Sequence, residues 1–297
     1  MENRHERKSY FFALAAVLLW ATSASAFKIS LRYINFGELL FLASLSAVIT
    51  VFMIILLSGR CKLLFQISPA EIRSSMLLGF LNPFLYYLIL FRAFSLLPAQ
   101  LAQPLNFIWP LMIVILSIPL LKRKVKLKDF AAIGISFLGV LIISTRGSFT
   151  SFKGSDPWGI FLALSSSLVW AFFWIYNTKN RLIPELKMFL NFCWGTIFIS
   201  IYLISSGNLE IPPVPGIIGG LYIGLFEMGI TFILWLKALR YTTNTARINN
   251  FIYLTPFLSL LVITLAVGER ILLATLAGLL LIVAGIAFQH LRFSRIK

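Results

Sequence analysis

Cysteine, histidine and acidic residues are all scarce in this sequence of 297 residues, which has 2 Cys, 2 His and 10 Asp+Glu. Cys61 and Cys193 lie in a basic and an apolar segment, so no disulfide framework is indicated. His5 and His290 lie near the two ends, which leaves no His/Cys cluster for a metal and no Ser/His/Asp set for a hydrolase. There is no Walker loop for ATP hydrolysis. We expect no cofactor and no enzyme activity.

Apolar residues are abundant instead. They make up 59% of the chain, and charged residues only 12%, whereas soluble proteins average roughly 45–50% and 25%. The mean hydropathy is +0.92, and apolar runs of about 20 residues, long enough to cross a bilayer as a helix, recur along the chain. We predict an all-α integral membrane protein with ten transmembrane helices. The predicted spans are Tyr10–Phe27, Phe36–Leu57, Ser74–Leu96, Ala99–Leu121, Phe130–Thr145, Trp158–Thr178, Met188–Ser206, Gly216–Leu239, Thr245–Val267 and Ile271–Gln289.

The first predicted span has a second interpretation. Basic residues precede it and the small residues Ser23–Ala26 lie near its end, a pattern that is also typical of a signal peptide. We favour a permanent helix, because the internal repeat described below requires this segment.

The chain carries 26 Lys+Arg and a net charge of +16, an excess that in a soluble protein would indicate nucleic-acid binding. If the N-terminus is cytoplasmic, 20 of the 26 cations fall in cytoplasmic segments. This is the positive-inside pattern of membrane proteins. We therefore expect both termini in the cytoplasm of a cell with a bacterial-type inner (plasma) membrane, and no nucleic-acid partner. The basic cluster Lys122–Lys128 then faces anionic lipid of the bilayer.

Matching residues recur in the same order at an offset of 145 to 150 positions. This predicts two repeats, residues 1–150 and 151–297, of five helices each. Because five is odd, the second repeat is expected to be inverted in the membrane. Inverted repeats with a substrate site between them near mid-membrane are a transporter architecture. The matched pairs include Trp20 and Trp170, Gly79 and Gly224, Asn82 and Glu227, Tyr86 and Thr231, and Pro110 and Pro256.

Short motifs lie at corresponding places in the predicted spans: Ala-Val-Leu-Leu-Trp20, Ser-Leu-Val-Trp170, Lys237-Ala238-Leu239, and Tyr253-Leu254-Thr255-Pro256 followed by Gly268-Glu269. With these motifs the chain resembles the drug/metabolite transporter (DMT) superfamily, specifically its ten-helix EamA-type exporters. The resemblance covers essentially the whole chain. The resemblance implies efflux of metabolites, with amino acids or related compounds as cargo. The chain departs from the family pattern at Ser44, where a basic residue is common, and at Lys122-Arg123, which replaces a Gly-Glu pair.

Glu227 is the most informative single residue. It lies near the middle of a predicted span, where an ionised carboxylate costs several kcal/mol unless it faces a cavity or a partner. We hypothesise that Glu227 either carries a coupling proton or meets a cationic group of the substrate. The alternative is a protonated or Arg-paired glutamate that only ties helices together.

Other polar and aromatic residues share predicted helix faces with Glu227 or occupy matching positions in the other repeat. The amides have an alternative role in hydrogen bonds between helices, and the tryptophans as lipid-facing anchors. Two prolines are candidate hinges, Pro110 and Pro256. The candidate pathway residues are Glu227, Asn82, Tyr86, Thr231, Gln103, Asn106, Trp109, Asn249, Tyr253, Trp20, Trp170, Trp174 and Trp235.

These observations predict a secondary transporter that exports small metabolites by alternating access, with protons as the candidate coupling ion. A flippase for lipids or lipid-linked sugars is an alternative within transport. A membrane enzyme is the alternative from another class, but it would need catalytic polar residues clustered at one membrane face, and none is found. The pairs Ala132/Gly139 and Gly278/Gly285 predict packing surfaces, either within the chain or between the protomers of a homodimer.

Overall fold

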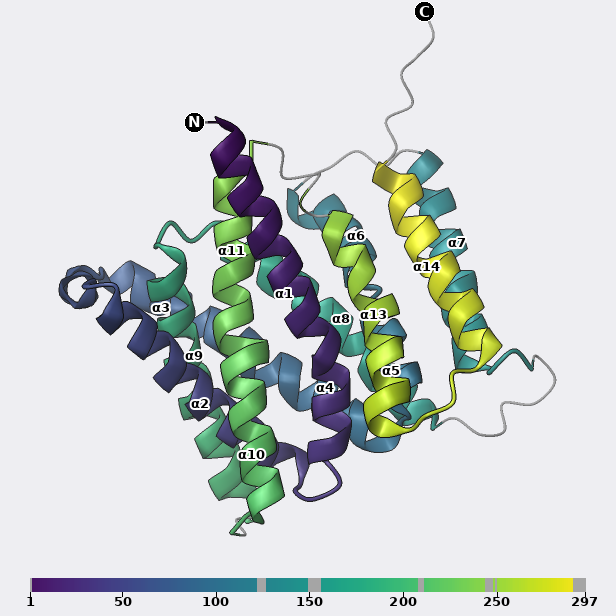
Figure 1. The fold of residues 1–297 in the computed structure, drawn as a ribbon, viewed down its shortest axis with the longest axis horizontal. Coiled ribbons are helices and arrows are strands. Elements are labelled where there is room, and N and C mark those ends of the chain that lie inside the picture. The colour runs from purple at the N-terminus through teal and green to yellow at the C-terminus, as the bar shows by residue number, and fades with distance from the viewer. Residues whose placement is uncertain are drawn as a thin grey trace, which may run out of the picture.

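The computed structural model describes residues 2–121, 127–148, 156–207, 211–243, 248 and 250–290, and in this part of the chain every regular element is a helix (Figure 1). Among the described residues, seven helical stretches are long and apolar enough to cross a membrane. The predicted fifth, ninth and tenth spans correspond to shorter apolar helices, Phe130–Ser144, Phe251–Val267 and Leu273–Phe288. The seven longer stretches are His5–Ser30, Phe36–Leu57, Pro69–Leu96, Ala99–Leu120, Pro157–Asn177, Pro184–Ser206 and Val214–Tyr241.

Several predicted spans are divided into shorter elements. The elements in chain order are α1 (Glu2–Ser30), α2 (Phe36–Leu57), η1 (Cys61–Gln66), α3 (Pro69–Gly79), η2 (Phe80–Leu85), α4 (Tyr86–Leu96), α5 (Ala99–Asn106), α6 (Trp109–Leu121), α7 (Leu127–Ser144), α8 (Pro157–Asn177), α9 (Pro184–Ser206), α10 (Val214–Tyr222), η3 (Ile223–Ile230), α11 (Thr231–Tyr241), η4 (Phe251–Leu254), α13 (Thr255–Val262), η5 (Ile263–Val267) and α14 (Leu273–His290). The third and seventh spans begin about one turn earlier than the apolar pattern predicts, at Pro69 and Pro184.

Polar capping residues explain where several helices begin. The side chain of Asn35 accepts a hydrogen bond from the Glu38 amide at the start of α2 (2.9 Å). Ser68 and Glu71 form a capping box at the start of α3, and Asp156 accepts from the Trp158 amide at the start of α8 (2.9 Å). Such caps contribute about 0.5–2 kcal/mol each by pairing amides that the helix leaves free. The capping box of Ser68 and Glu71 lets the third span begin before its apolar run.

Four spans are irregular in the middle. The third has π-helical geometry in η2 and a non-helical backbone at Asn82 (φ −149°, ψ 118°), and the eighth has the π-helical segment η3, which contains Glu227. The fourth is interrupted between α5 and α6, and the ninth contains the 3₁₀ segment η4 just before α13. The helices resume with Pro110 and Pro256 each as their second residue. Such irregularities open the backbone of a helix and are frequent at functional sites.

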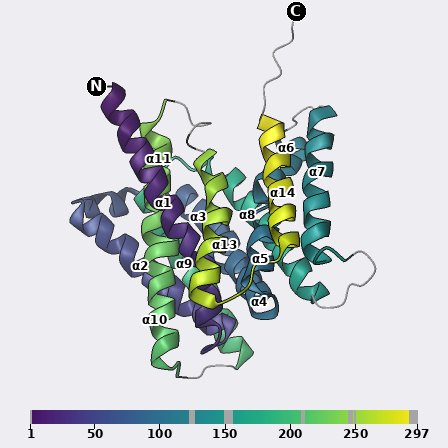
Figure 2. The same ribbon diagram turned by 45° about the vertical axis from the view of Figure 1, so that its right-hand side comes forward.

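Two long helix pairs bound the molecule on opposite sides, α2 with α9 and α7 with α14 (Figure 2). Ser44 and Thr196 share a hydrogen bond of 2.5 Å between α2 and α9. The glycine faces predicted on the fifth and tenth spans pack on each other within the chain, since a Cβ on Gly139 would collide with the Gly278 carbonyl. Between these pairs, α1 packs on α11 and α13, and α4 packs on α8.

Candidate functional site

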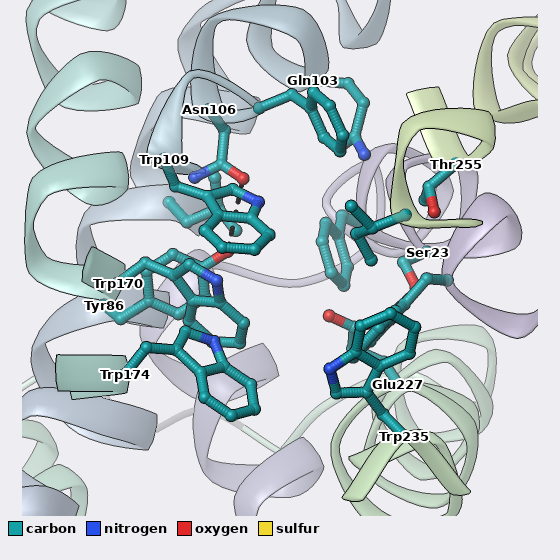
Figure 3. A pocket seen from close by; sticks show the side chains of 15 residues that line it. Ser23, Tyr86, Gln103, Asn106, Trp109, Trp170, Trp174, Glu227, Trp235 and Thr255 are labelled. Carbon is teal, nitrogen blue, oxygen red and sulfur yellow. Dashed lines mark hydrogen bonds between the residues drawn. The ribbon is translucent and has the colours of Figure 1, made fainter. Parts of the chain in front are cut away.

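A pocket lies in the middle of the fold between two groups of helices (Figure 3). One wall comes from α1, η3, α11, η4 and α13, and the other from α4, α5, α6 and α8. The pocket holds about 590 Å³ of space free of protein atoms, a volume that includes its open mouth. Its lining residues are Trp20, Ser23, Phe27, Tyr86, Leu90, Gln103, Asn106, Phe107, Trp109, Trp170, Trp174, Glu227, Trp235, Ile252 and Thr255.

One wall is aromatic. The rings of Tyr86 and Trp170 lie 4.4 Å apart, and Trp170 also contacts Trp174 (5.9 Å) and Trp109 (6.4 Å between centroids). Figure 3 shows these rings along one side of the pocket. Asn106 holds them in place, because its Oδ1 accepts from the Tyr86 hydroxyl (3.3 Å) and its Nδ2 donates to Ser166 (2.9 Å).

The opposite wall carries Glu227, which is 7% exposed. Ser23 donates a hydrogen bond to Oε2 of Glu227, and the hydroxyl of Tyr87 donates to Oε1 at 3.0 Å. Trp235 lies near Glu227 on the same wall (Figure 3), and the ring of Trp20, which also lines the pocket, lies 5.5 Å from the Trp235 ring between centroids. The carboxylate thus points into the pocket toward the aromatic wall.

The lining contains an acid but no basic side chain. Glu227 is its single ionisable carboxylate, and none of the lining residues, all of which the structure describes, is Lys, Arg or His. The two side chains that bond to Glu227 are neutral hydroxyl donors. Glu227 therefore has hydrogen-bond partners in the pocket but no countercharge there.

Polar contacts join the two walls at one end of the pocket. Glu269, which follows η5, accepts from the amides of Ala99 (2.9 Å) and Gln100 (3.0 Å) at the start of α5. The Gln100 side chain donates to the Arg270 carbonyl (2.8 Å). Lys28, at the end of α1, donates to two carbonyls at the end of α4, those of Phe94 (2.9 Å) and Leu97 (2.7 Å). We call Lys28, Gln100 and Glu269 the closing cluster.

A second buried carboxylate lies outside the pocket. Glu185, in the first turn of α9, is 2% exposed. Its Oε1 lies 3.1 Å from a guanidinium nitrogen of Arg60 and 3.9 Å from the Lys237 ammonium. Both cations are more than a third exposed. Unlike Glu227, Glu185 has protein cations beside it.

The pocket brings together most of the residues predicted for the pathway. Three predicted residues lie outside the lining. Asn82 is fully buried with no hydrogen-bond partner for its amide, Thr231 donates to the carbonyl of Phe226 within its own helix, and Tyr253 is half-buried beside the pocket. Asn249 lies outside the described residues. The predicted residues in the lining are Glu227, Tyr86, Gln103, Asn106, Trp109, Trp20, Trp170, Trp174 and Trp235.

The sequence reasoning missed the residues that bond to Glu227. Ser23 follows Trp20 by three positions, so the two share a helix face, and this spacing was the available signal. Thr255, which also lines the pocket, was missed as well. It directly precedes the predicted hinge Pro256, and this position could have indicated it. Tyr87 points to a different face from Tyr86, and no pattern indicated its contact with Glu227.

An all-helical fold of apolar spans around a central aromatic pocket with one buried carboxylate is typical of a multi-pass membrane protein. The EamA-like transporter family matches this chain twice, over residues 7–145 and 157–289. The chain therefore belongs to the EamA-like transporter family, within the DMT superfamily, and is a multi-pass membrane protein.

Similar proteins carry transporter names. The uncharacterized transporter YxxF of Bacillus subtilis (strain 168) is 25% identical over 86% of this chain and 81% of its own length. The uncharacterized transporter YdfC of the same strain is 28% identical over 76% and 74%. One crystal structure, described only as that of a protein, superposes with a TM-score of 0.70 at 22% identity, over 97% of this chain and 98% of the other. That likeness shows the fold alone.

Proposed function

We propose that this protein is a secondary transporter that carries small metabolites, such as amino acids or related compounds, through the Glu227 pocket by alternating access. The observation that carries the proposal is a pocket in the middle of the fold whose walls meet around one buried carboxylate. A static scaffold has no need of a mid-span acid, and an enzyme would need further catalytic groups around it.

The two walls support an inverted repeat of 1–150 and 151–297 with ten membrane spans. Each wall contains helices whose sequence counterparts lie in the other wall: α1 corresponds to α8, and α6 to α13. Trp20 and Trp170, which are matched in sequence, face the same pocket from opposite walls. Two related bundles around a shared site form the geometry in which rocking exposes the site to each side in turn.

Charge placement supports export. The start of α1 and the end of α14 lie at the same end of the molecule (Figure 1), and the excess of cations predicts that this end is cytoplasmic, in a bacterial-type inner membrane. The closing cluster lies at the opposite end of α1. In this arrangement the closing cluster joins the walls at the external side, which is the state in which an exporter would take up its substrate from the cytoplasm.

Glu227 supports coupling to protons. Its carboxylate is buried, bonded to two hydroxyls and open to the pocket. A single carboxylate that meets either a proton or the substrate, but not both, exchanges one for the other across the membrane. This exchange moves solute outward as protons move inward.

The test is transport of a metabolite panel by purified protein in proteoliposomes at two pH values. We expect at least one solute to move against its gradient when a proton gradient is imposed, and Glu227→Gln to lose the pH dependence. Movement of no solute, together with scrambling of lipid headgroups, would replace this proposal with a flippase.

A further inference from the structure

The pocket has an uneven chemical make-up, with many indole rings, one acid and no base. Five of the seven tryptophans in the sequence line it: Trp20, Trp109, Trp170, Trp174 and Trp235. We infer that the pocket binds a small organic cation, an alkylated ammonium group held between the Glu227 carboxylate and the indole faces. This inference rests on the proposed function and narrows its substrate class, from amino acids and related compounds to organic cations that carry no carboxylate.

Charge is the first argument. A cation in the pocket meets Glu227, whose oxygens have two hydroxyl partners but no cationic one among the described residues. A free amino acid would bring a carboxylate as well, and the lining offers no Lys, Arg or His to receive it. Burying a charge without a partner is costly. The lining therefore favours a net cation over a zwitterion.

The indole rings are the second argument. The face of Trp attracts a cation more strongly than any other side-chain ring, by about 0.5–2 kcal/mol for each contact, and aromatic cages of this kind recognise quaternary ammonium groups. Trp109, Trp170 and Trp174 line the wall opposite Glu227 (Figure 3). Trp235 lies on the wall of the acid itself (Figure 3), and Trp20 packs against it with centroids 5.5 Å apart. An ammonium between the walls has the acid on one side and indoles on several others.

Hydrogen bonding is the third argument, and it favours alkylation of the nitrogen. Each oxygen of Glu227 already accepts one hydrogen bond, which leaves about two acceptor positions on the carboxylate, and the Asn106 amide is bonded to Tyr86 and Ser166. A primary ammonium brings three N–H donors that need acceptors. An alkylated nitrogen needs few or none, and its methyl groups pack on rings. The lining is poor in free acceptors and rich in rings.

Two polar groups remain for the rest of the ligand. The Thr255 hydroxyl is buried without a hydrogen-bond partner, and the Gln103 amide points into the pocket (Figure 3). They suit a single neutral polar substituent, such as a hydroxyl. The ammonium could belong to a free solute or to a lipid headgroup, and the experiment below distinguishes these sources.

The test compares two probes that differ only in charge, (2-hydroxyethyl)trimethylammonium and its carbon analogue 3,3-dimethylbutan-1-ol. Binding to the purified full chain is measured by isothermal titration calorimetry, with tetramethylammonium and phenylalanine as further probes. We expect the cations to bind at least about tenfold more tightly than the neutral analogue and the amino acid, a difference of about 1.4 kcal/mol. Equal or tighter binding of the analogue or of phenylalanine would overturn the inference.

Variants add a second measurement. Glu227→Gln, which keeps the shape of the side chain, should lose at least about tenfold in affinity for tetramethylammonium. The matched control is Glu71→Gln, because Glu71 is a partly exposed acid outside the pocket, in the capping box of α3. Thermal unfolding shows whether each variant is folded. If Glu227→Gln fails to fold, the paired probes still decide the question on the wild-type protein.

Transport separates this inference from the proposed function. If tetramethylammonium binds but no solute crosses proteoliposomes, the cation site stands and the transporter proposal fails. If a neutral or zwitterionic solute is transported through the pocket and cations neither bind nor compete, the transporter stands and the cation site fails. Scrambling of phosphatidylcholine but not phosphatidylglycerol, inhibited by tetramethylammonium, would support the same ammonium chemistry with the lipid headgroup as its source.

Discussion

Glu227 and Glu185 are both buried glutamates, but their surroundings differ. Glu185 lies at the start of α9 with Arg60 and Lys237 beside it. Glu227 lies in the central pocket with only the hydroxyls of Ser23 and Tyr87. Within the part of the chain that the structure describes, cations lie beside one carboxylate and none lies beside the other. Burial alone therefore does not identify a functional acid. A buried acid that lines a cavity and has no countercharge beside it does.

Supplying Glu227 with a cation would remove this difference. Gln103→Lys places an ammonium on a side chain that already points into the pocket, where it would pair with Glu227 and repel a cationic ligand. We expect affinity for tetramethylammonium to fall by more than about thirtyfold, roughly 2 kcal/mol. Calorimetry measures the effect, and the uncharged Gln103→Met should lose much less. Similar losses in both variants would mean that charge is not the cause.

Weakening the aromatic wall should have a smaller effect. Trp170→Leu removes the ring at the centre of the cluster, in contact with Tyr86, Trp109 and Trp174. The loss of one cation–π contact, about 0.5–2 kcal/mol, predicts binding about 2–30-fold weaker. Trp158→Leu is the control, since Trp158 is 56% exposed and lies outside the pocket. If both substitutions weaken binding equally, the indoles of the pocket do not bind the ligand.

Glu269 should affect access to the pocket more than binding. Its carboxylate caps the start of α5 through two amides, so Glu269→Gln loses a charge-assisted contact of about 1 kcal/mol at a helix N-terminus. We expect the closed end to open more often. Leu90→Cys, in a background without Cys61 and Cys193, should then react with external thiol reagents severalfold faster. Unchanged reactivity would show that the closing cluster does not control access.

The smallest effect is expected at Glu185. Its removal by Glu185→Gln leaves Arg60 and Lys237, which are exposed enough to remain hydrated. The loss of stability should therefore be about 1 kcal/mol or less, measured as a small decrease in the melting temperature. A loss of several kcal/mol would show that this cluster contributes far more to the fold than exposed ion pairs usually do.

The sequence was sufficient to place the helices and Glu227. Apolar runs of bilayer length force helices, and an acid in such a run is conspicuous. Contacts between helices depend on their rotation, which no pattern specifies, and so Ser23 and Tyr87 were missed as partners of Glu227. Asn82 and Thr231 were predicted from regular helical stripes. The backbone interruption at Asn82 and the bond from Thr231 to the Phe226 carbonyl, at the five-residue spacing of a π-helix, take them out of the lining.

The most direct test of the difference between the two glutamates is a comparison of transport rates. Wild type, Glu227→Gln and Glu185→Gln are reconstituted in parallel, and initial rates of tetramethylammonium transport are measured under one proton gradient. We predict that Glu227→Gln loses more than about tenfold in rate, whereas Glu185→Gln stays within about twofold of wild type. Equal losses in the two variants, or full activity in Glu227→Gln, would contradict the assignment of Glu227 as the working carboxylate of the pathway.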